Sequence, residues 1–267
     1  MSKPIEVAKI AIKNAGGELK KLFWAASFEY SDKGKGKFDI ATEADKISEE
    51  HLISVIERDF PNDSIYSEEA GKHLKNENLW IIDPLDGTSN FICGIPLFAI
   101  AITYISKGMP EFCMFYYPAI DKIVYGKSGK GAFIDGKKFQ TDRTEKDAIQ
   151  IVSFIAGYKS DQEAQREIQS ILHKNFKRIL SFWCPSYDAL LISQGKIDAI
   201  VYQQNEIEDQ LPGVILAREA GCIIKTPDNK EFKYAGLSEH LPSLIVARND
   251  QICNTILELL RNKIPLK

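Results

Sequence analysis

The sequence predicts a mixed α/β or α+β fold, and three observations support this class. Apolar residues recur at helical spacing near the N-terminus. A block of short strand-like runs follows between residues 98 and 139. Strand-like and helical segments then alternate from about residue 148 onward. Strands in one block followed by alternation indicate two mixed layers rather than a single doubly wound sheet.

The N-terminal part is predicted to consist of helices and short strands. Ile5, Ala8 and Ile12 recur at the spacing of one helical face, which predicts a long first helix. A stretch rich in glycine and lysine then predicts a flexible basic loop. The predicted segments are, in order, a helix at 4–30, a loop at 32–37, a helix at 43–58, and strands at 63–67 and 79–82.

The central part is predicted to be a strand meander that begins at Phe98. Turn signals at Lys107-Gly108, Gly129 and Asp135-Gly136 divide it into strands up to about residue 139. Beyond residue 148 the predicted strands lie near 149–155, 177–182, 197–202, 221–225 and 243–247. The predicted helices lie near 160–173, 186–194, 209–220 and 249–262.

The chain has no internal repeat, low-complexity segment or clear linker. Its 267 residues, of which 44% are hydrophobic and 27% charged, have the composition of a globular protein with a sizeable core. We therefore expect a single domain over residues 1–267, with an N-terminal α+β half at about 1–145 and a C-terminal α/β half at about 146–267.

Charge and hydropathy argue against several classes of partner. The formal net charge of −3 gives no overall attraction to nucleic acid or acidic lipid. No apolar run reaches the roughly 18 residues of a membrane span, and the N-terminus lacks the apolar core of a secretory leader. Five cysteines without CxxC spacing indicate reduced, buried thiols. We expect a cytoplasmic protein that requires neither nucleic acid nor a membrane.

The most informative stretch joins a buried strand to two carboxylates. The apolar run that ends at Ile82 is followed by Asp83, Pro84, Leu85, Asp86 and Gly87. The two aspartates can face one point, and Leu85 can offer its backbone carbonyl there. Such oxygen ligands suit a hard cation such as Mg²⁺. The alternative is a purely structural Asp-Pro and Asp-Gly turn.

The same stretch also predicts an anion site. Gly87 is followed by Thr88 and Ser89, which are candidates for the cap and first turn of a short helix. A helix start carries free backbone N–H groups and a partial positive charge, which favour a phosphate. A metal and an anion are therefore expected side by side.

The string from Asp83 to Phe91, Asp-Pro-Leu-Asp-Gly-Thr-Ser-Asn-Phe, resembles the first signature of the inositol monophosphatase family. Members of this family are lithium-sensitive, Mg²⁺-dependent phosphomonoesterases. The resemblance implies a layered αβαβα sandwich that holds two or three Mg²⁺ ions per site and hydrolyses a small phosphorylated metabolite. We also expect a homodimer.

Two further acids take their roles from the resemblance. Glu68 matches the first acid of the family's Gly-Glu-Glu segment, a metal ligand that also serves catalysis, although a solvated acidic turn is the alternative. Asp45 ends a segment that resembles the family's Asp-x-Val-Thr-x-x-Asp. The family pairs this aspartate with the threonine matched by Thr88, so that the hydroxyl can orient the attacking water. The alternative for Asp45 is a first-turn acid favoured by the helix dipole.

The family's second signature, Trp-Asp-x-Ala-Ala-Gly, matches Glu208-Asp-Gln-Leu-Pro-Gly213. A following Glu-Ala-Gly, which starts at Glu219, fixes the register and places the metal-ligand aspartate at Asp209, which would also contact the substrate. Because Glu208 replaces the tryptophan, Glu208 is the alternative ligand.

The substrate-recognition segment departs from the family pattern. Trp183-Cys184-Pro185-Ser186 stands where the family has Gly-Ser/Thr-Ala-Ala, and Tyr202 replaces an acid that binds inositol hydroxyls. We expect Trp183 and Tyr202 to contact the substrate and to change specificity while the metal site stays intact.

The resemblance assigns the full site as follows. One metal would be held by Glu68, Asp83 and the Leu85 carbonyl, and a second by Asp83, Asp86 and Asp209; the phosphate would lie on Gly87, Thr88 and Ser89. Hydrolysis of fructose 1,6-bisphosphate or of 3′-phosphoadenosine 5′-phosphate is the enzymatic alternative. The non-enzymatic alternative is a binding or regulatory protein with the same fold.

Overall fold

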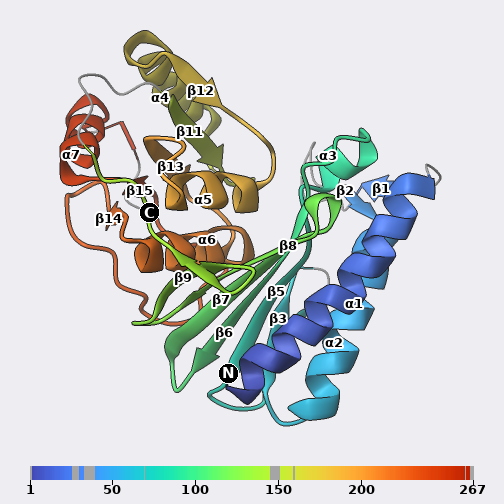
Figure 1. Ribbon diagram of the computed structural model, residues 1–267. Helices are drawn as coiled ribbons and strands as arrows, with labels where there is room; N and C mark the ends of the chain where they lie inside the picture. The colour runs from blue at the N-terminus through green and yellow to red at the C-terminus, as the bar shows by residue number, and fades with distance from the viewer. Residues whose placement is uncertain are drawn as a thin grey trace.

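The computed structural model describes residues 2–25, 30–32, 40–68, 70–144, 151–158, 160–261 and 263–264. In these ranges two large sheets and three helical layers stack in the order α–β–α–β–α (Figure 1). The predicted mixed class and layered αβαβα sandwich are confirmed. None of the described helices is long and apolar enough to cross a bilayer.

The first helical layer contains α1 (Lys3–Ala25) and α2 (Glu43–Asp59), which cover one face of the larger sheet (Figure 1). Ile12 and Leu19 of α1 and Leu52 of α2 are completely buried, as is Trp80 on the sheet. These side chains belong to one apolar cluster, and removal of this area from water stabilises the layer at about 25 cal/mol per Å².

The larger sheet has eight strands in the order β10-β9-β8-β7-β6-β5-β3-β4. Only the β3–β5 pair is parallel among the described pairs of this sheet. The bounds are β3 (Ser64–Ser67), β4 (Gly71–His73), β5 (Leu79–Asp86), β6 (Ala99–Ser106), β7 (Met109–Tyr117), β8 (Lys122–Lys127), β9 (Gly131–Ile134) and β10 (Lys137–Phe139).

Strand β5 runs four residues beyond its predicted end at Ile82. Its register against β6 shifts between Asp83 and Asp86, and Asp86 then pairs with Ala99. A bulge of this kind tolerates Pro84, which has no N–H to donate to a regular ladder. The irregularity brings both aspartates to the end of one buried strand.

Two other differences lie near the N-terminus. Helix α1 ends at Ala25 rather than at residue 30, and an unpredicted antiparallel hairpin pairs β1 (Tyr30–Asp32) with β2 (Ile40–Thr42). The predicted loop at 32–37 falls mainly on residues 33–39, which lie outside the described residues, as does Glu69.

The C-terminal half contributes the other three layers. Helices α5 (Pro185–Ser193) and α6 (Ile207–Ala220) form the middle layer between the two sheets, and α4 (Gln162–Asn175) and α7 (Asp250–Leu259) cover the outer face (Figure 1). The second sheet has the order β12-β11-β13-β15-β14. Its strands are β11 (Ile151–Ala156), β12 (Arg178–Leu180), β13 (Ala199–Gln203), β14 (Ile223–Lys225) and β15 (Leu244–Ala247).

One apolar cluster spans the middle layer and both sheets. It includes Phe115 of β7, Val214 and Leu216 of α6, and Ile200 of β13, all completely buried. The carboxylates described below stand on elements that share this packing, so the core fixes their relative positions.

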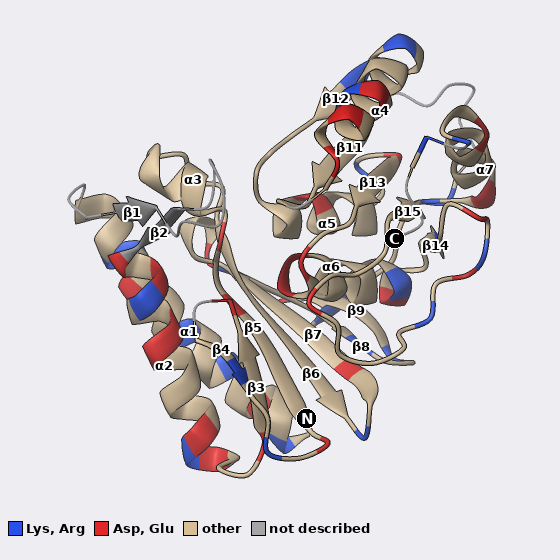
Figure 2. Cartoon of the chain, turned by 180° about the vertical axis from the view of Figure 1, so that it is seen from behind, with Lys and Arg blue, Asp and Glu red and all other residues tan. Residues whose placement is uncertain are grey.

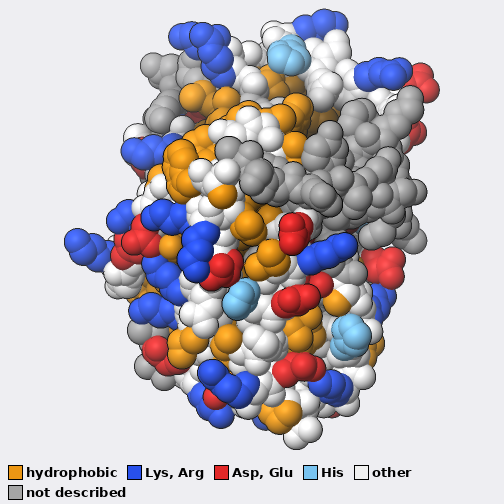
Figure 3. Space-filling view, turned by 90° about the vertical axis from the view of Figure 1, so that its right-hand side faces the viewer, with side chains coloured by type: hydrophobic (Ala, Val, Ile, Leu, Met, Phe, Trp, Pro, Cys, Tyr) orange, Lys and Arg blue, Asp and Glu red, His pale blue; other side chains and the backbone are white. Residues whose placement is uncertain are grey.

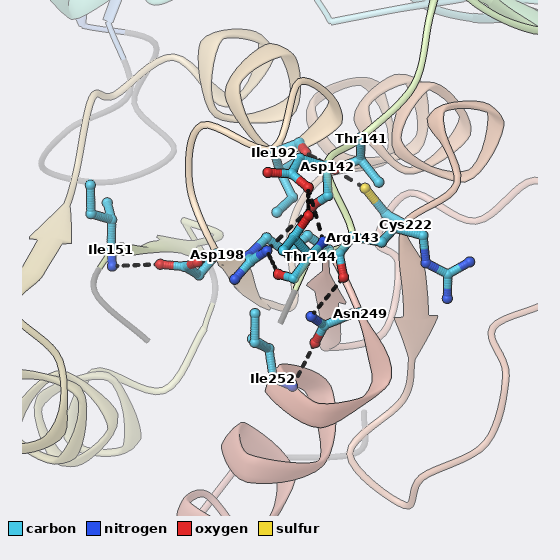
Figure 4. A network of polar contacts seen from close by, with 11 residues as sticks. Thr141, Asp142, Arg143, Thr144, Ile151, Ile192, Asp198, Cys222, Asn249 and Ile252 are labelled. Carbon is cyan, nitrogen blue, oxygen red and sulfur yellow. Dashed lines mark hydrogen bonds and ion pairs between the residues drawn. The ribbon is translucent and has the colours of Figure 1, made fainter. Parts of the chain in front are cut away.

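A buried ion pair anchors the segment that leaves the first sheet (Figure 4). Arg248 is completely buried and its Nε donates to Asp198 Oδ1 at 2.8 Å. The Arg248 guanidinium also donates to the carbonyl oxygens of Asp142, at 3.4 Å, and Thr144. Asp198 Oδ2 accepts from the N–H of Ile151 at 3.0 Å. A buried charge is tolerated only when it is paired and hydrogen-bonded in this way.

All five cysteines are free, and four of them are buried as predicted, whereas Cys93 is exposed.

Candidate active site

Three carboxylates from the two halves of the chain meet in one place. Oxygen atoms of Asp83, Asp86 and Asp209 lie within 4.8 Å of one another. The first two come from the end of β5 and the third from the first turn of α6. Figure 2 shows the red acidic segments at the end of β5 and the start of α6 on facing sides of the space between the halves.

Burial and mutual repulsion destabilise the ionised forms of these acids. Burial, followed by the nearby Glu68 and Asp86, raises the pKa of Asp83 well above its usual value. Burial and then Asp86 and Glu206 raise the pKa of Asp209. Every charged neighbour that contributes to the Asp83 shift is an acid. A cation between these oxygens would relieve both effects, and carboxylate oxygens are the ligands that Mg²⁺ prefers, so the residues fit this metal.

Asp86 differs from the other two because donors surround it. Burial raises its pKa to about 6, and hydrogen bonds from Ser186 and Cys184 oppose that rise. The backbone N–H of Ser186 donates to Asp86 Oδ2 at 2.6 Å, and the thiol of Cys184 lies 3.4 Å from the Asp86 carbonyl oxygen. The start of α5 thus partly offsets the effect of burial and favours the ionised form of this carboxylate.

Glu68 lies in the turn directly after β3, half-buried, beside the group of three. It is the largest charged contributor to the Asp83 pKa shift, but its carboxylate is outside the described group that meets within 4.8 Å. Buried Glu49 holds this turn, since it accepts from the Ser67 hydroxyl and, at 2.9 Å, from the N–H of Ala70.

The predicted Thr88–Asp45 pair is present in the structure. Thr88 Oγ1 lies 3.0 Å from Asp45 Oδ1 and 3.0 Å from the carbonyl oxygen of Leu85. Asp45 is completely buried in the first turn of α2. The Leu85 carbonyl therefore lies beside the acidic group, and the Leu85 N–H donates to Asp83 Oδ1 at 3.0 Å.

Gly87 precedes the short helix α3 (Thr88–Ile92), which also contains Ser89. Its φ of 94° is in the left-handed region that favours glycine. A Cβ on Gly87 would lie 2.8 Å from the Leu97 carbonyl oxygen and 3.2 Å from Cys184 Cβ. No other residue fits here without displacing the loop or the start of α5.

The two residues predicted to alter substrate contacts lie in opposite environments. Trp183 is 65% exposed, with a φ of 54°. Tyr202 is completely buried in β13, and its hydroxyl, 3.0 Å from a Cβ built on Gly213, has no hydrogen-bond partner among the described residues. Its pKa is raised by burial and then by Asp188, Asp86 and Asp209. Tyr202 therefore lies close enough to Asp86 and Asp209 for their charges to act on it, but its side chain is not exposed to a substrate.

Glu208, the alternative ligand, contacts Tyr66. It is buried beside Tyr66, with which it forms a side-chain hydrogen bond that helps to raise the Tyr66 pKa. Asp209, not Glu208, belongs to the described group of three carboxylates.

Sequence reasoning missed Ser186 and Glu49 as site residues. Ser186 was noted only as part of a departing segment, because its role depends on a backbone N–H that contacts a residue 100 positions away. Glu49 follows Asp45 by four residues and so lies on the same face of α2. A second acid on the buried face of a predicted helix was the available signal.

A model of the inositol monophosphatase family matches residues 1–264. The chain belongs to the inositol monophosphatase family. The family predicted from the string Asp83–Phe91 is therefore confirmed.

Relatives within this family carry several names. The "fructose-1,6-bisphosphatase/inositol-1-monophosphatase" of Aquifex aeolicus is 30% identical over 228 residues, which cover 84% of this chain and 85% of the relative. The "Nus factor SuhB" of Salmonella typhimurium is 29% identical over 266 residues, 97% of this chain and 96% of that protein. The crystal structure of extragenic suppressor protein suhB from Bartonella henselae has a TM-score of 0.87 at 21% identity, with 98% and 100% coverage, and this likeness concerns the fold.

Proposed function

We propose that this chain is a Mg²⁺-dependent phosphomonoesterase that hydrolyses a small phosphorylated metabolite. The observation that supports this most directly is the meeting of Asp83, Asp86 and Asp209 within 4.8 Å, next to the Thr88–Asp45 hydrogen bond. Family membership gives independent support. A cation site beside an activated hydroxyl is what metal-assisted attack of water on a phosphate requires.

The residues present would hold two ions. Glu68, Asp83 and the Leu85 carbonyl would bind one, and Asp83, Asp86 and Asp209 would bind the other. Bound Mg²⁺ would stabilise the negative charge that develops on the phosphoryl and leaving-group oxygens. Asp83 would contribute to both positions, since the charges of Glu68 and of Asp86 both raise its pKa.

The protein would orient the attacking water through Thr88. Its hydroxyl donates to the buried Asp45 carboxylate at 3.0 Å, which leaves the hydroxyl oxygen available to accept a hydrogen bond from water. As water gives a proton to Thr88, the threonine would pass its own hydroxyl proton to Asp45. A threonine hydroxyl is a weak base alone, so the carboxylate partner is necessary. The backbone of Gly87, Thr88 and Ser89 would hold the phosphate at the start of α3.

The deciding experiment is phosphate release from a panel of phosphomonoesters, with Mg²⁺ and with excess EDTA. The panel should include inositol 1-phosphate, fructose 1,6-bisphosphate, glycerol 2-phosphate and a nucleotide 3′-phosphate, because the Aquifex aeolicus relative is named for both a sugar bisphosphate and inositol phosphate. We expect Mg²⁺-dependent release from at least one compound. Release that survives EDTA would contradict the proposal.

A regulatory role is the second candidate, because a relative that aligns with 97% of this chain is named a Nus factor. The catalytic and the regulatory role can be distinguished by comparing the wild-type chain with Asp86→Asn. A chain that retains a cellular function after Asp86→Asn, while its hydrolysis is lost, has a role that does not depend on catalysis.

A further inference from the structure

The start of α5 is one wall of the candidate site. The Ser186 N–H contacts Asp86 at 2.6 Å, and Cys184 Cβ would lie 3.2 Å from a Cβ on Gly87. A substrate whose phosphate lies on Gly87 and whose metal is held by Asp86 therefore has its leaving group close to this wall. The chemistry of the wall is then relevant to which alcohols the site accepts.

The backbone N–H groups of the first residues of α5 are either absent or already used. Pro185, the first residue of α5, has no N–H. The N–H of Ser186 donates to Asp86, and the N–H of Tyr187 donates to the Cys184 carbonyl oxygen at 2.9 Å. The Ser186 hydroxyl also bonds to Asp86. A hydroxyl-rich leaving group placed here would find no free backbone N–H on these residues to replace its hydrogen bonds to water.

The surroundings of the wall are apolar. Trp183 is 65% exposed and Ile95 is 40% exposed, while Phe182 and Leu97 are half-buried. We call these four residues the apolar rim. Figure 3 shows hydrophobic side chains gathered in the upper half of the face that carries α3.

Polar contacts hold the two segments of the rim together next to the site. Asn90 Nδ2 donates to the carbonyl oxygens of Phe182, at 2.6 Å, and Leu97, at 2.8 Å. The Leu97 carbonyl and Cys184 are also the groups that a Cβ on Gly87 would meet. The rim is thus continuous with the residue that would bind the phosphate.

Trp183 itself is held in an unusual conformation. Its φ of 54° is in the left-handed region, which a bulky residue adopts only at an energetic cost. The tight turn leaves the indole exposed beside the site, and large exposed apolar groups of this kind commonly mark binding surfaces.

From these observations we infer that the site takes phosphomonoesters whose leaving group is apolar or aromatic and poor in hydroxyls, with the apolar rim as its contact surface. This inference rests on the proposed phosphomonoesterase activity. Trp183 is then a specificity residue that contacts the leaving group. The acidic group alone would bind the metal.

The test compares 2-phenylethyl phosphate with inositol 1-phosphate and glycerol 2-phosphate. All three leaving groups are alkyl alcohols, so differences in kcat/KM report on contacts rather than on the reactivity of an aryl ester. We expect 2-phenylethyl phosphate to be the best of the three by roughly 10-fold or more, the range for one apolar contact in a pocket. A preference for inositol 1-phosphate would overturn the inference.

Variants of the two exposed tryptophans make the test specific. Glycine adopts a positive φ without strain, so Trp183→Gly should keep the turn. It should lower kcat/KM for 2-phenylethyl phosphate roughly 10-fold more than it lowers kcat/KM for glycerol 2-phosphate. Trp183→Phe should retain the preference. The matched control is Trp24→Ala on α1, since Trp24 is 66% exposed. This variant should leave kcat/KM unchanged for both substrates.

A non-hydrolysable analogue gives a second measurement. Inhibition by 2-phenylethylphosphonate should weaken in Trp183→Gly and not in Trp24→Ala. If Trp183→Gly changes only the oligomeric state measured by light scattering, the apolar rim is an interface between copies of the chain and the inference is wrong. If no phosphomonoester is hydrolysed with Mg²⁺, the proposed function fails instead, which keeps the two failures distinct.

Discussion

Ser186 donates its backbone N–H to Asp86 at 2.6 Å across 100 positions of sequence. The bond joins the start of α5 in the C-terminal half to the end of β5 in the N-terminal half. It fixes the orientation of one carboxylate of the acidic group, and Asp209 on α6 completes the group from the same half as Ser186.

Asp86→Asn should abolish Mg²⁺-dependent hydrolysis while the fold survives. Loss of a direct metal ligand should exceed the roughly 10–100-fold effect of changes to groups that only orient ligands. The substitution also removes one of several repelling acids, so the melting temperature without metal should hold or rise. Rates and thermal melts of Asp86→Asn and of the exposed control Asp121→Asn test this. Full activity in Asp86→Asn would remove Asp86 from the site.

Thr88→Ala should lower kcat by roughly 10²–10⁴-fold, the usual contribution of a positioned proton-transfer group. Thr88→Ser keeps the hydroxyl and should retain most of the activity. Since Asp45 acts through Thr88, Asp45→Asn should also lower kcat, and the double variant should lose little more than either single one. Mg²⁺ binding measured by calorimetry should be unchanged in Thr88→Ala. A weaker Mg²⁺ affinity there would indicate a structural role for the hydroxyl.

Asp188 gives a prediction about pH. Burial raises its pKa to about 7 from an ordinary value near 3.8. The folded state therefore binds a proton that the unfolded state releases between these values, so this group stabilises the fold increasingly as pH falls from about 8 to 5.

Asp188→Asn should raise the melting temperature of the metal-free protein at pH 8, by about 2–4 °C for each kcal/mol recovered. It should also flatten the dependence on pH between 8 and 5. Thermal melts of wild type and variant at several pH values measure this. An unchanged slope would mean that Asp188 does not titrate in that range.

Lithium should inhibit hydrolysis at millimolar concentrations. The resemblance to lithium-sensitive phosphomonoesterases implies that Li⁺ replaces the metal nearer the leaving group. A small monovalent ion can bind the acidic group but supplies less charge to the leaving oxygen. Activity is measured with LiCl and with NaCl at equal ionic strength. Equal rates in both salts would argue against this branch of the family.

Arg248→Met should destabilise the protein by about 3–5 kcal/mol, because it leaves Asp198 buried without its partner. The double variant Arg248→Met with Asp198→Asn should recover part of this loss, since no unpaired charge remains. Urea unfolding measures both. If the single and double variants unfold alike, the pair contributes little beyond the apolar contacts of the arginine.

The structure brings together those predicted site residues that belong to one short segment. Asp83 and Asp86 were recognisable because their spacing, with Pro84 and Gly87, is a property of one short segment. Asp209 required the register of a second motif that matches imperfectly. The contact of Ser186 with Asp86 and the support of the Glu68 turn by Glu49 were not predictable, because each depends on how separate elements pack.

In the fold, too, features with a long local pattern were predictable and features that depend on packing were not. Helix α2 was predicted within one residue, since its apolar spacing repeats over several turns, whereas α1 ends five residues before its predicted end. The strands of the hairpin at 30–32 and 40–42 are three residues long, too short for an alternating pattern to be recognised. The extension of β5 was missed because Pro84 is a normal signal for the end of a strand, and only the bulge against β6 accommodates it.

The acidic group is divided between β5 and α6, so its geometry depends on the core residues that pack these two elements together. Val214, Leu216 and Ile200 touch no phosphate or metal, yet they belong to the packing that sets the position of α6 against the first sheet. A substitution among them that the fold tolerates can still separate Asp209 from its two partners by a fraction of an ångström. If the acidic group binds metal as proposed, these positions are constrained by metal affinity as well as by stability, and they should change more slowly than other equally buried positions.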